Sequence, residues 1–251
     1  GKDANAVKEC MLVENVYDLQ YMEHNTAGNY MLSTDIDAGE TSDWIDDDKL
    51  DSNLKGFKPI SNLSGVFDGA THVIKNLYIN RPYALGVGLF GGSIGTIQNV
   101  GLENGNITGN GTVGSVAGQA SGTIRNVYNT GMVSGSSNVG GIVGASSATI
   151  TNVYNTGNVS GSSNSVGGVL GHVRSGTITN VYNTGTVNGA TATNVGGVIG
   201  DATGVFTGTI TDLYITNVYN TGTVSGSSSV GGVVGSIRNA VLTNAYNTGA
   251  M

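Results

Sequence analysis

The segment "TITNVYNTGNVSGSSNSVGGVLG", Thr149 to Gly171, decides the fold, because close copies of it recur along most of the chain. It contains no acid, no base, no histidine and no cysteine. Its short runs of Val, Ile, Thr and Tyr, separated by glycine and serine, are typical of short β-strands joined by turns. A segment so poor in reactive groups indicates a repeated structural unit.

Two markers define the period of the repeat. The tetrapeptide "YNTG" begins at Tyr128, Tyr154, Tyr182, Tyr219 and Tyr246, in steps of 26, 28, 37 and 27 residues. The dipeptide Val-Gly runs in phase with it, at Val87, Val113, Val139, Val166, Val195 and Val230. A period between about 20 and 50 residues indicates stacked repeats.

The kind of repeat follows from its length and pattern. No apolar spacing of three and four residues is sustained in the repeated part, which excludes helical repeats. A propeller blade needs roughly 40 residues or more. We therefore predict an all-β protein, a right-handed parallel β-helix (solenoid) in which each repeat makes one turn and equivalent strands pair about 4.8 Å apart.

The inward-facing positions are predicted from residues that vary little between repeats. A row of large aliphatic residues is expected inside: Ile97, Ile124, Ile150, Ile178, Ile215 and Leu242. The next row includes Gln98 and Arg125 and is expected outside. Strict alternation then directs the following asparagines and the tyrosines of "YNTG" toward the interior or its corner, with the asparagine amides bonded along the axis.

The same alternation predicts an outer face on which threonine and valine lie side by side. Its threonines are Thr151, Thr179, Thr216 and Thr243, and its other members are Val153, Val181, Val218 and Ala245. Ice-binding solenoids use such flat, uncharged faces, so ice binding is one alternative function. Exposed Thr and Val are also what any β-surface prefers.

Charge is concentrated near the amino terminus. Of 27 charged residues, 21 precede residue 84, and the net charge is −7 without a basic cluster. This distribution argues against nucleic acid or an anionic membrane as a partner. No apolar run approaches the roughly 20 residues that span a bilayer, so we expect no membrane insertion. The single cysteine, Cys10, cannot form an internal disulfide, and we expect it to be buried.

We predict one β-helix domain, residues 1–251, in three parts. Residues 1–25 form a cap, because "NVYDLQYMEHN", Asn15 to Asn25, has the apolar spacing of a short amphipathic helix. Residues 26–83 form irregular first coils, and residues 84–251 form regular repeats of about 26 residues. Since the last repeat stops directly after "YNTG", we expect the chain to continue into further repeats or domains.

Ligand-binding residues are sought where the repeat is broken, because loops on a rigid scaffold often carry binding. The amino-terminal loops contain the candidates Asp35, Asp37 and Trp44. The insertion "DATGVFTGTITDLYI", from residue 201 to residue 215, contains the candidates Val205 and Phe206.

Calcium is the one cofactor that the sequence suggests. The acidic run "DWIDDDKLDSN", from residue 43 to residue 53, offers Asp46, Asp47, Asp48 and Asp51. Calcium takes six to eight oxygen ligands, but this spacing matches neither the EF-hand loop nor the nonapeptide calcium repeat. A solvated acidic loop is the alternative interpretation, and we expect no other metal or cofactor.

Several segments resemble a known family. The segments "VGLFGG", "VGGIVG", "VGGVLG", "VGGVIG" and "VGGVVG" resemble the GLUG-motif repeats of bacterial surface proteins, and the middle three are followed by an "I-x-N-x-Y-x-x-G" strand. "GNYMLSTDIDA" (residues 28–38) and "GVFDGATHVIKNLYINRP" (residues 65–82) are similar to the unit that precedes such repeats. That unit occurs in filamentous-haemagglutinin-like adhesins and in the non-catalytic region of IgA-specific metallopeptidases.

The resemblance implies an extracellular β-helix on a bacterial cell surface, part of a longer exoprotein. Its implied role is an adhesin or display stalk, whose partner is a host cell, a matrix protein or a glycan. A purely structural spacer and a glycan-active enzyme are the alternatives. The related peptidases carry an HExxH zinc motif, which His24, His72 and His172 do not form, so we expect no enzymatic activity.

Overall fold

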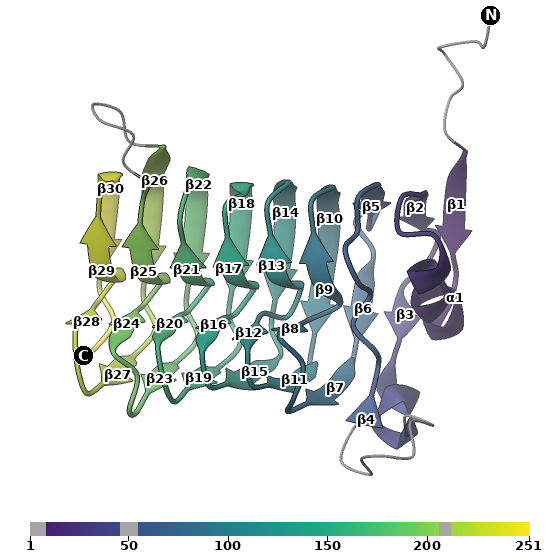
Figure 1. Ribbon diagram of the computed structural model, residues 1–251, viewed down its shortest axis with the longest axis horizontal. Coiled ribbons are helices and arrows are strands. Elements are labelled where there is room, and N and C mark those ends of the chain that lie inside the picture. Colours follow the sequence, from purple (N-terminus) through teal and green to yellow (C-terminus); the bar gives the residue numbers. More distant parts are fainter. Residues whose placement is uncertain (1–8, 46–54, 206–211) are drawn as a thin grey trace, which may run out of the picture.

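The computed structural model describes residues 9–45, 55–205 and 212–251 and consists of a parallel β-solenoid (Figure 1). Four sheets run along its axis, and each regular turn contributes one strand to each of them. Two of the sheets hold six strands each among the described residues, so about six turns are complete. The predicted parallel β-helix is confirmed.

The strands of the four sheets, named A to D, are as follows. Sheet A contains β1 (Cys10–Val13), β2 (Asn29–Leu32), β3 (Ile36–Asp37), β5 (Val66–Asp68), β6 (Val73–Lys75), β10 (Thr96–Glu103), β14 (Thr123–Asn129), β18 (Thr149–Asn155), β22 (Gly176–Asn183), β26 (Leu213–Asn220) and β30 (Val241–Asn247). Sheet B contains β4 (Lys55–Gly56), β7 (Tyr78–Arg81), β11 (Asn106–Gly109), β15 (Met132–Gly135), β19 (Val159–Gly161), β23 (Val187–Gly189) and β27 (Val224–Gly226). Sheet D contains β8 (Gly86–Val87), β12 (Thr112–Val113), β16 (Asn138–Gly140), β20 (Ser165–Gly167), β24 (Asn194–Gly196) and β28 (Val230–Gly231). Sheet C contains β9 (Phe90–Ser93), β13 (Ala117–Ala120), β17 (Val143–Ser146), β21 (Leu170–Val173), β25 (Ile199–Thr203) and β29 (Val234–Arg238).

Neighbouring strands pair in a register that aligns equivalent residues of successive repeats. In sheet A, Tyr128 pairs with Tyr154, Tyr154 with Tyr182, and Tyr182 with Tyr219. Among the named strands of the described ranges, every pair is parallel except β4 and β7. Each side chain therefore lies above its copy from the previous turn.

The predicted alternation along the sheet A strands is correct only up to the first asparagine. The aliphatic row that includes Ile124 and Ile150 is buried, as expected. Asn152 then adopts a left-handed conformation with φ of 56°, which asparagine tolerates better than most residues. It is skipped in the strand pairing, so Thr151 and Asn152 both lie outside and Val153 turns inward.

This local feature overturns two predictions. The first asparagines and the tyrosines do not point inward: Asn126, for example, is exposed, and Tyr128 is half-buried on the outer side. Val153 and Val181 are fully buried, so the flat outer face of threonine beside valine, on which ice binding was considered, does not form there. The positive φ recurs at every repeat, at Asn99, Asn126, Asn152, Asn180, Asn217 and Asn244.

The second asparagine of each repeat, in "YNTG", forms a ladder inside the solenoid. Asn155 is fully buried; its Nδ2 donates to Oδ1 of Asn183 at 2.9 Å and to the carbonyl of Gly157 at 2.7 Å. Equivalent bonds join Asn129, Asn155, Asn183, Asn220 and Asn247. Since an unpaired buried amide costs about 1–3 kcal/mol, this ladder is what allows asparagine in the core.

Glycine makes room for that inner ladder. A Cβ on Gly168, the second glycine of "VGGVLG", would lie 2.4 Å from Cγ of Asn183 and 2.1 Å from the carbonyl of Gly197. The first regular turn has neither the inner asparagine nor this glycine. Leu102 stands at the asparagine position, because it pairs with Asn129, and Leu89 stands at the glycine position. Both leucines are buried, so in this turn two apolar side chains take the place of the asparagine and its neighbouring glycine.

The amino-terminal part of the solenoid contains the helices (Figure 1). Helix α1 (Val16–Tyr21) is followed by the 3-10 helix η1 (Met22–His24), and a second 3-10 helix, η2 (Gly39–Asp43), lies between β3 and β4. Val16 and Leu19 of α1 are buried, as the amphipathic pattern predicted. None of the helices in the described ranges has the length and apolar character needed to cross a membrane. Cys10 is exposed on β1, so the prediction that it is buried was wrong.

We predict that Gly168→Ala destabilises the protein, because its Cβ would meet backbone and the inner ladder at less than 2.5 Å. Overpacking of this kind costs about 1–3 kcal/mol. Gly91→Ala is the matched control, since its Cβ would find its nearest neighbour at 3.3 Å. Thermal unfolding monitored by circular dichroism compares the two; equal melting temperatures would contradict the packing described for the second glycine.

Candidate functional site

A stack of tyrosines runs along the outside of sheet A. The rings of Tyr128, Tyr154, Tyr182, Tyr219 and Tyr246 have centroids 4.7–5.0 Å apart and interplanar angles of 3–5°. The spacing equals that of paired strands, because each ring is carried by the same position of consecutive turns. Tyr246, on the last turn, is 56% exposed.

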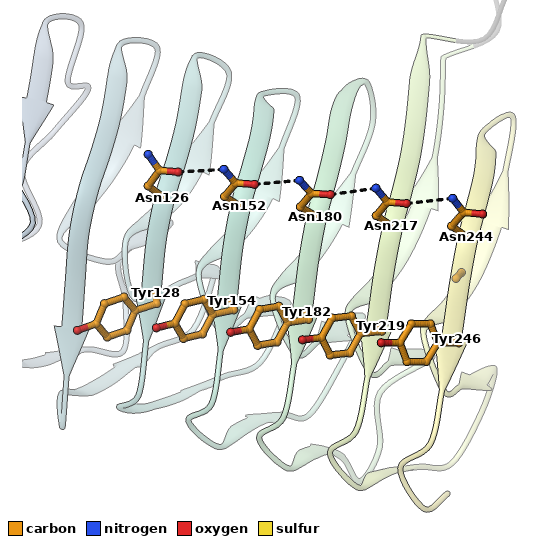
Figure 2. A pocket seen from close by; sticks show the side chains of 11 residues that line it. Asn126, Tyr128, Asn152, Tyr154, Asn180, Tyr182, Asn217, Tyr219, Asn244 and Tyr246 are labelled. Carbon is orange, nitrogen blue, oxygen red and sulfur yellow. Dashed lines mark hydrogen bonds between the residues drawn. The ribbon is translucent and has the colours of Figure 1, made fainter.

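The exposed asparagines form a second ladder beside the stack (Figure 2). In this outer ladder Nδ2 of Asn152 donates to Oδ1 of Asn126 at 3.1 Å, and Nδ2 of Asn180 donates to Oδ1 of Asn152 at 3.0 Å. Further bonds of the same kind join Asn244, Asn217, Asn180, Asn126 and Asn99. All these amides donate toward the amino terminus, whereas the inner ladder donates toward the carboxyl terminus.

The outer ladder ends on a carboxylate. Nδ2 of Asn99 donates to Oδ1 of Asp68 at 3.0 Å, and Nε2 of Gln98 donates to its Oδ2 at 2.6 Å. Partial burial raises the pKa of Asp68, but hydrogen bonds from Ala70 N, Gln98 and Asn99, together with the charge of Arg125, outweigh it and lower the pKa below its ordinary value. A row of aligned amides thus points its positive ends at an anion.

The tyrosine stack also ends on an acid. The hydroxyl of Tyr128 donates to Oε1 of Glu103 at 2.7 Å. Partial burial and this hydrogen bond to Glu103 raise the pKa of Tyr128 well above its ordinary value. In the preceding turn the tyrosine position is Gly101, whose Cβ would lie 2.2 Å from the ring of Tyr128. The stack therefore begins at Tyr128 because glycine gives the first ring a place to lie.

An open groove of about 910 Å³ lies between the outer ladder and the stack. Figure 2 shows its two borders, amides on one side and ring edges on the other. No charged residue is among those that line it. The groove offers hydrogen-bonding amides and hydroxyls at one regular spacing, which suits binding of a long, uncharged ligand.

The acidic candidates of the amino-terminal loops are held by internal bonds. Asp35 accepts hydrogen bonds from Nδ1 of His72 at 3.1 Å and from the amide of Val73 at 3.2 Å. Hydrogen bonds from Val73 N and His72 lower the pKa of Asp35. Asp37 accepts from Gly39 N and from Nδ2 of Asn76, both at 2.9 Å, and these bonds lower its pKa.

The other candidates are distributed over distant parts of the fold. Trp44 is partly buried and packs between Phe57 and Tyr17, with ring centroids at 6.3 and 5.5 Å. Val205 is half-exposed at the end of the turn that follows β25, and its amide donates to the carbonyl of Arg174. Phe206 and the calcium candidates Asp46, Asp47, Asp48 and Asp51 lie outside the described residues. Within the described ranges no three acids, histidines or cysteines gather as a metal site would require.

Sequence reasoning missed the groove as a candidate site. The signal was present, because Tyr and Asn recur at each repeat, but strict alternation directed both inward. Asparagine at one position of six consecutive repeats would have indicated a left-handed conformation.

These features define a class: a parallel β-helix whose surface carries stacked tyrosines and hydrogen-bonded asparagines. No family model matches the chain. It is 41% identical over 133 residues to Halomucin of Haloquadratum walsbyi; the match covers 47% of this chain and 1% of Halomucin. It is also similar to the crystal structure of a "putative immunoglobulin A1 protease" from Bacteroides ovatus, with a TM-score of 0.71, 25% identity, and coverage of 94% of this chain and 74% of the other.

We predict that Tyr182→Ala destabilises the protein by about 1–3 kcal/mol, since it removes two ring contacts worth about 0.5–1.5 kcal/mol each. Tyr83→Ala is the control, because Tyr83 is exposed and lies outside the stack. Thermal unfolding of both variants is the measurement. A Tyr182→Ala variant as stable as the control would show that the stack contributes nothing.

We predict that Asp68 stabilises the protein above its unfolded pKa of about 3.9 and that this stabilisation is lost as pH falls through the lowered folded pKa. Asp68→Asn removes the titrating group. The melting temperature of the wild type should therefore exceed that of Asp68→Asn at pH 6 and approach it as the pH falls below 3.9. A difference independent of pH would contradict the lowered pKa; Glu9→Gln, at an exposed position, is the control.

Proposed function

We propose that this chain is a non-catalytic β-helical stalk of the GLUG-repeat type, within a larger exoprotein on the cell surface or in the extracellular medium, and that it mediates or supports attachment. The observation that carries the proposal is the unbroken register of sheet A, where five tyrosines and six asparagines stack turn upon turn. Such a stack resists bending at every turn, because each turn contacts its neighbours over its whole length.

The comparisons support a place in a larger protein. The matched segment is 1% of Halomucin, whose name is that of a mucin, and 94% of this chain is similar to 74% of a chain from Bacteroides ovatus. Secreted and surface proteins use repeated domains to extend away from the cell. We propose that this chain is the repetitive, extended part of such a protein. We do not extend the protease activity in the neighbour's name to it.

The distribution of charge supports attachment without catalysis. Carboxylates and histidines that could act as acid and base are scarce beyond residue 84, where the sequence has Glu103, Asp201, Asp212 and His172. Glu103 accepts from Tyr128, and Asp201 accepts from Thr203. The groove of sheet A, by contrast, repeats amide and hydroxyl groups along its length. A host glycan or an extended matrix protein would find one contact at each turn.

The test is a binding assay with the purified, folded chain. We expect it to bind to members of a glycan array, to immobilised matrix proteins or to host cells, and to release no sugar from polysaccharides. The double variant Asn152→Asp/Asn180→Asp places two carboxylates, which repel each other, in neighbouring positions of the outer ladder. Binding through the groove should therefore decrease. Circular dichroism establishes that the variant remains folded.

Two results would contradict the proposal in different ways. A folded chain that binds nothing on these arrays would be a purely structural spacer. The stalk part of the proposal would then stand, and the attachment part would be wrong. Turnover of a polysaccharide by the wild type, lost on substitution of an acid, would make the chain a glycan-active enzyme.

A further inference from the structure

One cluster of charged residues interrupts the uncharged repeats of sheet C. The equivalent outward positions of consecutive strands are Gln119, Ala145, His172 and Asp201. Two of these four are ionisable, and Arg174 lies two residues beyond His172. Stacking between turns explains a residue that recurs at every turn. It does not explain charged residues that occur in only one part of the sheet.

The cluster is ordered by its own contacts. Asp201 is 8% exposed; its Oδ2 lies 3.3 Å from Nδ1 of His172, and its Oδ1 accepts from the hydroxyl of Thr203 at 2.8 Å. Nε of Arg174 donates to Nε2 of His172 at 3.2 Å. Burial lowers the pKa of His172, Asp201 raises it, and Arg174 lowers it; the net effect is a lowered pKa, which keeps the ring neutral and able to accept from Arg174.

These bonds leave the end of the guanidinium group available. The hydrogen bond to His172 uses Nε, and no hydrogen bond or ion pair joins the two terminal nitrogens of Arg174 to another group in the described part of the chain. A guanidinium group presents its two terminal N–H groups as a planar fork that matches a carboxylate. Held by His172 at its base, Arg174 is therefore preoriented for an anion.

A hollow lies next to this fork. It has a volume of about 300 Å³, at the lower end of the range for small-molecule sites, and the small side chain of Ala145 leaves it open between Gln119 and His172. Its lining is polar: Thr112, Gln119, Asn138, Ser147 and Arg174 contribute hydroxyl, amide and guanidinium groups. Asp201 is not among the lining residues, so the hollow presents the cation and not its acid.

We propose that this hollow binds one acidic sugar residue of a glycan, with its carboxylate on Arg174 and its hydroxyls on the surrounding amides and hydroxyls. This inference rests on the proposed function and names the class of ligand. A peptide carboxylate would also meet Arg174, but apart from the imidazole of His172, which is bonded to Asp201 and Arg174, the lining has no aromatic or large aliphatic side chain to receive a peptide residue. A sugar, with several hydroxyls on one ring, matches the polar lining better.

The surroundings permit an anion there. Although the net charge is −7, most acids precede residue 84. Beyond that point the three acids Glu103, Asp201 and Asp212 are balanced by the three arginines Arg125, Arg174 and Arg238. At the hollow itself the two nearest charges are those of Arg174, which is part of the lining, and Asp201, which lies on the other side of His172 and is not part of the lining.

The test measures binding of methyl glucuronide by saturation-transfer NMR, with methyl glucoside as the uncharged analogue. We expect the wild type to bind the glucuronide and not the glucoside. Arg174→Gln should raise the Kd at least about tenfold, since a charge-assisted hydrogen bond is lost. Arg125→Gln, which removes an equal charge from sheet A, should leave the Kd unchanged.

The positioning role of His172 has its own readout. His172→Ala leaves the charge of Arg174 but removes the acceptor for Nε, and binding should weaken. His172→Gln, whose amide oxygen can accept from Arg174, should restore part of it. Melting temperatures establish that both variants fold, and a loss of binding equal in the two would overturn the role given to His172.

Other outcomes overturn the site itself. Equal binding of glucuronide and glucoside, or an unchanged Kd in Arg174→Gln, would exclude a carboxylate on Arg174. Tighter binding of the peptide N-acetyl-Ala-Asp than of the glucuronide would assign the hollow to a protein ligand. If the wild type binds cells or neutral glycans but no glucuronide, this inference is wrong, whereas the proposed attachment function is not contradicted.

Discussion

Parallel pairing of equivalent strands is the constraint on which the rest of this structure depends. Once β14, β18, β22, β26 and β30 pair in register, every side chain of one turn must lie about 4.8 Å from its copy in the next. Only residues that stack well on themselves are acceptable under that rule. Tyrosine stacks ring on ring, asparagine bonds amide to amide, and like charges would repel, which explains why the repeats contain almost no charge.

Much of the fold could be predicted because the same constraint is visible in the sequence. The period of "YNTG" gave the length of a turn, and the aliphatic row with Ile150 gave the core. What failed was the direction of the residues after Asn152, since a single left-handed residue in the strand reverses the alternation that follows it. The exposure of Cys10 on the first strand could not be predicted from the sequence, because burial at that position depends on residues that are distant in sequence.

The candidate sites divide along a similar line. Asp35, Asp37 and Trp44 were proposed because they break the repeat, and the structure places each in internal contacts. The groove of sheet A was missed because its residues looked structural. The Arg174 hollow needed the strand register, which aligns Ala145 with His172 and His172 with Asp201 across turns 27 to 29 residues apart in sequence.

Regular and irregular positions thus have different roles in this chain. The repeated residues give a stiff scaffold with two ladders of opposite polarity, and the rare departures from the repeat modify one place on its surface. A spin-label distance across four turns of sheet A tests the register directly. In a Cys10→Ser background, labels at Arg125→Cys and Thr243→Cys should give one narrow distance distribution, consistent with backbones about 19 Å apart. A broad distribution, or one centred far from that separation, would contradict the stacked register on which the account rests.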